Sequence, residues 1–155
     1  MEKQLDIVPF KPNMAKAFKE LNLDWLEAFF SVEPHDIELL DHCEESIINK
    51  GGFIFFAKIG ENVVGTFALL KIDSGIYELG KMAVDRSFRG QKIGQQLLAF
   101  CIRYAEKHHW KKLVLYSSTK LSDAIHIYEK YGFIEVPLEV GNPYLRSDIK
   151  MELNL

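Results

Sequence analysis

The hydrophobic pattern of the first fifty residues predicts one strand followed by helices. Apolar residues over 5–8 indicate a short strand that ends at Pro9. Apolar spacing of three and four residues predicts a helix over about 14–22, and residues 23–30 carry the same spacing less regularly. Asp36 is a good N-cap residue, so we expect it to begin a helix that runs to about residue 49.

The pattern then changes to that of β-strands. Two apolar runs at 53–59 and 63–72 are separated by a turn, which predicts an antiparallel hairpin. A third strand over 76–84 makes the hairpin a three-stranded meander. Alternation along this third strand predicts Met82 and Val84 on the face of Glu78 and Gly80, with Leu79, Lys81 and Ala83 opposite.

The remaining chain returns to helical periodicity before its last strands. A long amphipathic helix is predicted over 91–108, with an apolar stripe formed by Ile93, Leu97, Cys101, Tyr104 and Ala105. A strand at 113–116 follows, and the strand, helix, strand order predicts a parallel crossover. A helix over 123–131 and strands at 133–136 and 148–153 complete the chain. We expect one α+β domain over 1–155, with a mixed, mostly antiparallel sheet of about seven strands and about four helices.

Composition narrows the class of protein. The 155 residues are 48% hydrophobic and 26% charged, which suits one compact domain. Nineteen Lys and Arg against 22 Asp and Glu leave a net charge of −3, so neither nucleic acid nor an anionic membrane is an expected partner. Two distant cysteines, outside any CxxC spacing, indicate no zinc cluster, and we expect no metal. A charged N-terminal stretch and no long apolar run predict a cytoplasmic protein.

Residues 84–94 form the segment best suited to hold a phosphate. A strand runs there into a glycine-containing turn and then into the long helix, whose first N–H groups are free to bind an anion. Gly90 and Gly94 allow close approach to the backbone, and Arg89 and Lys92 add positive charge. The alternative is structural: Gly90 begins the helix and Gly94 packs against a strand.

Two motifs around this segment resemble those of the Gcn5-related N-acetyltransferase family. The first is Met82-Ala83-Val84 followed by Arg89-Gly90-Gln91-Lys92-Ile93-Gly94, with Lys92 at the position of the family's first glycine. The second is Ala124-x-x-x-Tyr128-x-x-x-Gly132-Phe133. Ser117 or Ser118 stands where an asparagine is often found. The resemblance extends over roughly residues 53–136.

The resemblance implies a sheet splayed between its fourth and fifth strands, with acetyl-CoA as co-substrate in the gap. The implied cofactor-binding residues are Met82, Ala83 and Val84 for the pantetheine arm, Arg89, Gly90, Gln91, Lys92, Ile93, Gly94 and Gln95 for the pyrophosphate, and Ser118. Tyr128 would protonate the departing thiolate. The alternative for Tyr128 is an aromatic side chain that packs its helix on the sheet.

Glu78 is the candidate general base. An alkylammonium acceptor, with a pKa of ~10.4, must lose a proton before it can attack. Glu78 precedes Met82-Ala83-Val84 in a strand similar to the one that carries the base in histone acetyltransferases of the family. The alternatives are a carboxylate that faces solvent or pairs with Lys81 or Arg86, and a chain of waters in place of a base.

The acceptor is expected to be a primary amine of a small molecule, an amino-acid-like compound or a peptide. By resemblance, Trp25, Phe29, Glu33 and His35 line its pocket, although the aromatic pair also suits a core. The surplus of acidic residues would attract a cationic amine to this cleft. A homodimer is left open.

Two functions are compatible with these residues. The first is an acetyl-CoA-dependent N-acetyltransferase that transfers the acetyl group directly to the amine. The second is a non-catalytic module that binds or senses acyl-CoA. The first is favoured because Tyr128 and Glu78 are both present, whereas binding needs only the phosphate loop.

Overall fold

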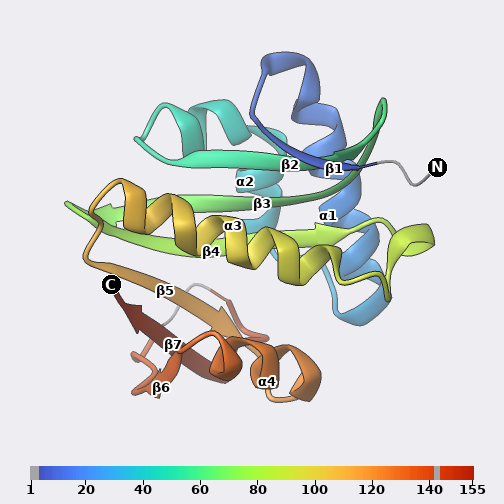
Figure 1. Cartoon of the computed structure of the whole chain (residues 1–155). Coiled ribbons are helices and arrows are strands. Elements are labelled where there is room, and N and C mark those ends of the chain that lie inside the picture. The colour runs from blue at the N-terminus through green and yellow to red at the C-terminus, as the bar shows by residue number, and fades with distance from the viewer. Residues whose placement is uncertain (1–3, 142–143) are drawn as a thin grey trace.

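The computed structural model describes residues 4–141 and 144–155 and contains one seven-stranded sheet. The strand order is β1-β2-β3-β4-β5-β7-β6, and only the β4–β5 pair is parallel (Figure 1). The strands are β1 (Leu5–Pro9), β2 (Phe53–Ile59), β3 (Asn62–Asp73), β4 (Ile76–Val84), β5 (Lys112–Ser117), β6 (Ile134–Val136) and β7 (Ile149–Asn154). The predicted hairpin, meander and parallel crossover are confirmed, and with them the α+β class.

Four α-helices lie in this part of the chain. They are α1 (Ala15–Phe29), α2 (Pro34–Asp41), α3 (Ile93–Lys107) and α4 (Ser122–Lys130). Short 3₁₀ turns span Pro12–Met14 and Arg86–Phe88, and a π-helical turn spans Glu44–Ile48. Among the described residues, no helix is long and apolar enough to cross a membrane.

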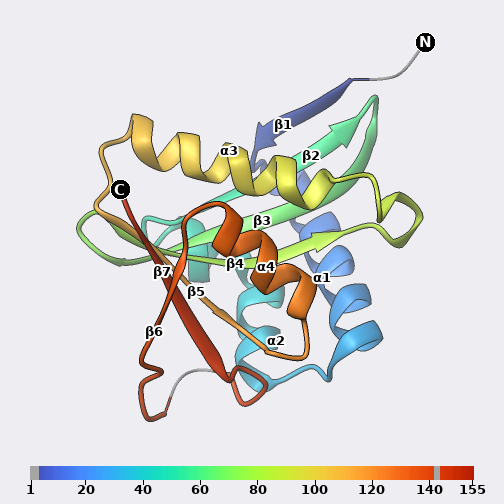
Figure 2. The ribbon, with the colours of Figure 1, turned by 60° about the horizontal axis from the view of Figure 1, so that its bottom comes forward.

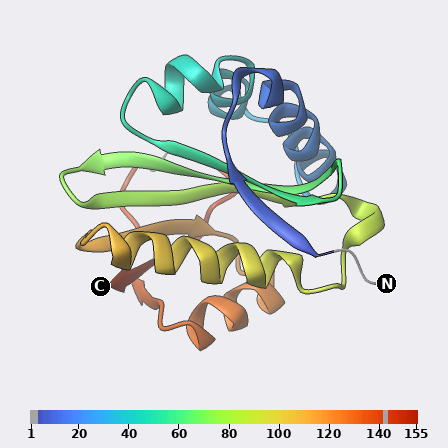
Figure 3. The ribbon, with the colours of Figure 1, turned by 45° about the horizontal axis from the view of Figure 1, so that its top comes forward.

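The helices cover both faces of the sheet. Figure 3 shows α1 and α2 on one side and α3 and α4 on the other, and Figure 2 shows α3 crossing the sheet before the chain returns as β5. Two hydrophobic clusters match these layers, one around Phe18, Leu26 and Phe56 and the other around Phe67 and Leu97. The predicted stripe of α3 packs into the second cluster, as expected of an amphipathic helix.

The first two helices differ from their predicted bounds. The helix expected to end near residue 22 continues, and residues 15–29 form one helix. The buried Asn22 side-chain amide donates a hydrogen bond to the Phe18 carbonyl of the same helix at 3.0 Å. Asp36 is not the N-cap of α2. The N-cap is Glu33, three residues earlier. The Asp36 carboxylate accepts a hydrogen bond from the Glu33 N–H at 2.9 Å, which completes a capping box. The helix ends at Asp41, and a π-helical turn replaces the rest of the predicted helix.

A β-bulge in β4 overturns the predicted faces of that strand. Ala68 of β3 pairs with Gly80, but Thr66 pairs with Ala83, so β4 carries one extra residue between these pairs. Met82 and Val84 consequently pack against the same cluster as Leu79, instead of sharing a face with Glu78. Lys81, at the bulge, has a φ of 51°.

The sheet opens between β4 and β5. Only three residue pairs are in register, and the last is Glu78 with Val114. Beyond it the strands are unpaired with each other, so their ends leave space between them.

Candidate active site

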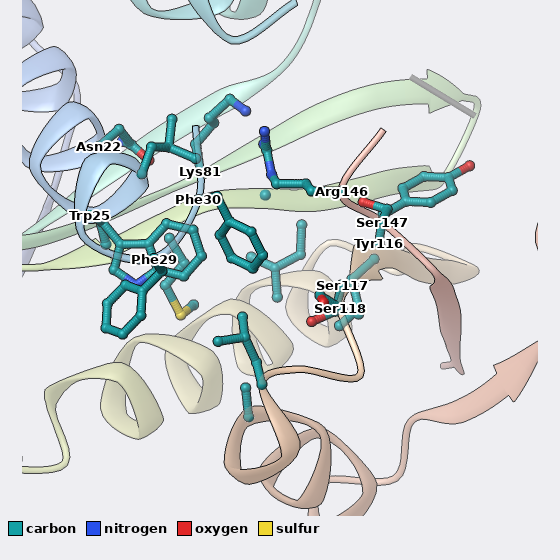
Figure 4. Close-up of a pocket in the computed structure, with 18 of the residues that line it drawn as sticks. Asn22, Trp25, Phe29, Phe30, Lys81, Tyr116, Ser117, Ser118, Arg146 and Ser147 are labelled. Atoms are coloured by element: carbon teal, nitrogen blue, oxygen red, sulfur yellow. The ribbon is translucent and has the colours of Figure 1, made fainter. Parts of the chain in front are cut away.

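A cavity of about 330 Å³ occupies the gap between the ends of β4 and β5 (Figure 4). The end of α1 forms one wall with Trp25, Phe29 and Phe30, and Ser117 and Ser118 of β5 and the loop after it lie opposite. The remaining lining comes from β4, the turn after it, the start of α3, β5, α4 and the segment before β7. Its residues include Glu78, Lys81, Met82, Ala83, Val84, Arg89, Gly94, Tyr116, Tyr128, Tyr144, Arg146 and Ser147.

The turn between β4 and α3 presents backbone N–H groups. Gly90 has a φ of 83° and Lys92 a φ of 61°, so Lys92 adopts the left-handed conformation that favours glycine. Because Lys92 is left-handed, α3 begins at Ile93 rather than at the predicted residue 91. The first N–H to bond back along the helix is that of Gln96, to the Lys92 carbonyl at 3.1 Å. The preceding N–H groups of the first turn are free for an anion.

Open space surrounds Gly94. A Cβ placed on this residue would meet no heavy atom within 4 Å, so Gly94 is not a close packing contact between helix and strand. Gly94 also lines the cavity, which leaves its backbone accessible to a bound group. Gly90, Gln91, Lys92, Ile93 and Gln95 lie in the adjoining turn and first helical turn, outside the cavity lining.

Arg89 places a charged donor next to this turn. Its Nε donates to the Val84 carbonyl at 3.2 Å, and its guanidinium lies 5.4 Å from the centre of the Phe29 ring. Its Nη2 is 3.5 Å from Asp24 Oδ2, yet it is buried and makes no hydrogen bond. Asp24 is thus the anion nearest this nitrogen, while the Arg89 side chain adds positive charge to this end of the cavity.

Tyr128 of α4 lines the cavity from the β5 side. Its ring packs edge-on against Phe133, with centroids 5.9 Å apart, so the predicted packing contact exists together with access to the cavity. Burial raises the pKa of Tyr128 to about 12. The phenol therefore keeps its proton at neutral pH and can act as a donor.

Glu78 lies at the closed end of the gap with only 9% of its surface exposed. Burial away from water raises the pKa of Glu78 to about 7, although the charge of Lys81 and a hydrogen bond from Tyr144 act in the opposite direction. Pairing with Lys81 or Arg86 was the alternative for Glu78. Instead, Lys81 bonds to Asp36 at 2.6 Å and Arg86 to Asp24 at 2.7 Å.

Only part of the predicted acceptor pocket is in the cavity wall. Trp25 and Phe29 line it, with ring centroids 5.4 Å apart, whereas Glu33 and His35 do not. The Glu33 carboxylate is used in accepting hydrogen bonds from the backbone N–H of Leu145 at 2.8 Å and from Arg146 Nη1 at 3.0 Å. The His35 ring packs 5.1 Å from that of Tyr144, behind the wall.

The charge of the cavity wall also differs from expectation. Its charged lining residues are one carboxylate, Glu78, and three cations, Lys81, Arg89 and Arg146. The expectation that the surplus of carboxylates surrounds the acceptor cleft is therefore wrong for the described lining residues. The acidic surplus of the chain lies elsewhere, with Asp36 and Glu33 placed behind Arg146 as its ion-pair partners.

Sequence reasoning missed the roles of Tyr144, Arg146 and Asp36 at this site. Tyr144 and Arg146 lie in an irregular segment with no motif, and Asp36 carried only a capping signal. Ser118, which was predicted, is buried in the wall, and its Oγ accepts from the Lys120 N–H at 3.2 Å. Among residues 4–141 and 144–155, no cluster of three or more His, Cys, Asp or Glu side chains is arranged to hold a metal ion.

Comparison with known proteins agrees with this geometry. The family model described as "Acetyltransferase (GNAT) family" matches residues 16–133. An uncharacterized N-acetyltransferase of Dictyostelium discoideum is 37% identical over 80 residues, which are 52% of this chain and 37% of that relative. The chain thus matches well under half of that relative's length.

Solved structures share the fold over nearly the whole chain. An acetyltransferase of the GNAT family from Staphylococcus aureus Mu50 is 25% identical, with a TM-score of 0.84, covering 97% of this chain and 99% of that chain. The PaiA N-acetyltransferase of Thermoplasma acidophilum, solved in complex with coenzyme A, has a TM-score of 0.77 at 17% identity, covering 98% and 99%. The match over residues 16–133 shows that this chain belongs to the acetyltransferase (GNAT) family.

Proposed function

We propose that this protein is an N-acetyltransferase that transfers the acetyl group of acetyl-CoA directly to a primary amine. The observation that carries the proposal is one cavity lined by a buried carboxyl with a pKa near 7, a protonated tyrosine and the glycine at the start of α3. A proton acceptor, a proton donor and an anion site are the groups that this reaction requires.

The residues at the start of α3 fit a diphosphate. The free N–H groups of the first turn, the open space at Gly94 and the positive charge of Arg89 in the cavity wall all favour an anion there. Met82, Ala83 and Val84 would hold the pantetheine arm along β4, beyond the last pair with β5. When bound, acetyl-CoA supplies an acyl group activated as a thioester.

Glu78 and Tyr128 divide the proton transfers. Glu78 accepts a proton from the ammonium of the acceptor, directly or through water, so that the free amine can attack the acyl carbon. A backbone N–H of Ala83 or Val84 stabilises the negative charge that develops on the acyl oxygen. As the C–N bond forms and the C–S bond breaks, Tyr128 donates its proton to the sulfur. The second proton, released from the newly acylated nitrogen, restores the Tyr128 phenol directly or through water.

The acceptor class is a small-molecule, amino-acid-like or peptide amine. Trp25 and Phe29 provide an apolar wall near the cavity mouth, and Phe29 remains 37% exposed. An acceptor with an apolar portion next to its amine would bury that surface against the two rings.

The test is an acceptor screen that detects free CoA. The protein is incubated with acetyl-CoA and a panel of amines, amino acids and N-terminal peptides, and acceptor-dependent release of CoA supports the transferase. Thermal stabilisation by acetyl-CoA without any acceptor-dependent release would instead support the CoA-binding module. Absence of both effects would contradict both functions.

A further inference from the structure

A buried ion cluster joins three separate segments beside Glu78. Asp36 of α2 is fully buried and accepts hydrogen bonds from Lys81 Nζ at 2.6 Å and from Arg146 Nη1 and Nη2 at 2.7 and 2.8 Å. Lys81 comes from the β4 bulge and Arg146 from the segment before β7, and Figure 4 shows the nitrogen ends of these two side chains close together. Charges buried this deeply are tolerated only when paired, so the cluster specifies how the three segments meet.

The two cations of the cluster hold Tyr144. Lys81 Nζ lies 4.6 Å from the centre of the Tyr144 ring, and the Arg146 guanidinium lies 4.7 Å from it. The His35 ring packs against the same residue at 5.1 Å. Tyr144 is 5% exposed, and these three contacts hold its ring. Tyr144 and Glu78 line the same cavity, and hydrogen bonding from the Tyr144 phenol lowers the pKa of the Glu78 carboxyl.

We propose that Tyr144 is a positioning residue for Glu78, and that Asp36 holds Tyr144 in place through Lys81 and Arg146. The inference rests on the proposed function, in which Glu78 is the base. Tyr144 orients the carboxylate and favours its ionised form, because a phenol donates to a carboxylate more strongly than to a neutral carboxylic acid. Lys81 favours the same form by its charge.

The backbone at Lys81 supports this assignment. Its φ of 51° is unusual for a residue with a side chain, and such conformations persist where surrounding contacts enforce them. The bulge turns Lys81 toward α2, and the ion pair with Asp36 keeps it there with 4% of its side chain exposed.

Other charged groups near Glu78 do not replace these contacts. Glu139 raises the pKa of Glu78 and Lys150 lowers it, but these two are paired with each other at 2.8 Å. Tyr116 donates to Glu139 at 2.6 Å, and Glu152 pairs with Lys112 at 3.3 Å. Lys81 and Tyr144 are thus the groups whose loss acts most directly on Glu78.

The decisive experiment measures the titration of Glu78 in the free protein. Its carboxyl carbon is followed by NMR from pH 4 to 9 in the parent and in Tyr144→Phe, which keeps the ring and removes only the donor. We expect the midpoint of Glu78 to rise by about one pH unit. Tyr116→Phe, which removes a phenol that donates to Glu139 instead, is the matched control and should move the midpoint much less. An unchanged or lower midpoint in Tyr144→Phe overturns the proposal.

The support from Asp36 is tested with Asp36→Asn, using Asp41→Asn on the same helix as the control. Asp41 pairs with Lys19 at the surface, so its loss should change neither folding nor titration. In Asp36→Asn the buried Lys81 loses its partner and its proton, so the midpoint of Glu78 should again rise. If Asp36→Asn folds and Glu78 titrates with the parent's midpoint, Asp36 has no part in holding Tyr144. If Asp36→Asn does not fold, Tyr144→Phe still tests whether Tyr144 positions Glu78.

The titration separates this inference from the proposed function, because it needs no turnover. In an active protein, the acidic limb of the kcat/KM profile should follow the NMR midpoint upward in Tyr144→Phe. A parent that titrates as expected but releases no CoA with any acceptor would contradict the transferase and leave Tyr144 as the group that orients Glu78.

Discussion

Glu78 of β4 and Val114 of β5 form the last pair in register before the two strands separate. The backbone of Glu78 is therefore fixed in the sheet, while its side chain lines the cavity that opens one residue further on. A carboxyl group at this point is held rigidly and removed from water, yet it can reach a group bound in the gap. The proposed base and the opening of the sheet are thus the same structural feature.

The pH dependence of activity should report Glu78. With its pKa at about 7, kcat/KM should rise about tenfold per pH unit below 7 and level off above it, since only the ionised form accepts a proton. In Glu78→Gln we expect this acidic limb to disappear and the plateau to fall by ~10²-fold. Glu61→Gln, in the exposed turn after β2, is the control. A Glu78→Gln profile identical to that of the parent would rule out the base.

Stability should depend on pH through the same residue. The pKa of Glu78 is raised in the folded state from an ordinary 4.5 to about 7, so between these values the folded protein holds a proton that the unfolded chain has lost. Unfolding then releases a proton, and stability falls as the pH rises through this window. Glu78→Gln should therefore be more stable than the parent by roughly 2–4 kcal/mol at pH 8 and by much less at pH 4.5. Thermal melts at both pH values measure the difference, and an equal gap at each would contradict it.

Tyr128 should affect turnover and not binding. Tyr128→Phe keeps the ring against Phe133, so the fold and the affinity for CoA should be retained. Loss of the proton donor should lower kcat by ~10²-fold with an acceptor of high pKa. Steady-state kinetics with CoA affinity measured by calorimetry tests this, and a parent-like kcat would show that another group protonates the sulfur.

Gly94 should control binding at the start of α3. Gly94→Asp places a carboxylate in the open space beside the free N–H groups, where it would repel a diphosphate and occupy its donors. We expect CoA affinity to fall at least 100-fold, while the melting temperature of the free protein stays near that of the parent because a Cβ meets nothing there. Gly94→Ala is the control for size without charge. Normal CoA affinity in Gly94→Asp would refute the placement.

Trp25 should affect the acceptor alone. Trp25→Ala removes one of the aromatic rings in the cavity wall at the end of α1, which should raise the acceptor KM by roughly tenfold through lost apolar contact. The affinity for acetyl-CoA should not change, because the anion site lies at the start of α3. Glu27→Ala, an exposed change on the same helix, controls for effects on α1. An unchanged acceptor KM would remove Trp25 from the acceptor site.

Local signals account for what could be predicted. The glycine at position 90, the free N–H groups before Gln96 and the stripe of α3 all depend on residues within one or two turns of each other. Two errors arose where polar side chains bond locally in a way that their residue types alone do not predict. Asn22 continues a helix instead of ending it, and Asp36 caps from the third helical position because Glu33 precedes it.

The sequence by itself determined the order of strands and helices and the glycine-containing turn that leads into α3, because periodicity and turn chemistry are encoded by near neighbours. The candidate pair Glu78 and Tyr128 came from the sequence too, through the resemblance of its motifs to those of the family. Only the tertiary structure decided which side chains surround Glu78. Asp36 contacts Lys81 across 45 positions and Arg146 across 110, and no local pattern specifies partners at such separations. One extra residue in β4 also exchanged the faces of Met82 and Val84, because strand alternation predicts a face only while the register continues.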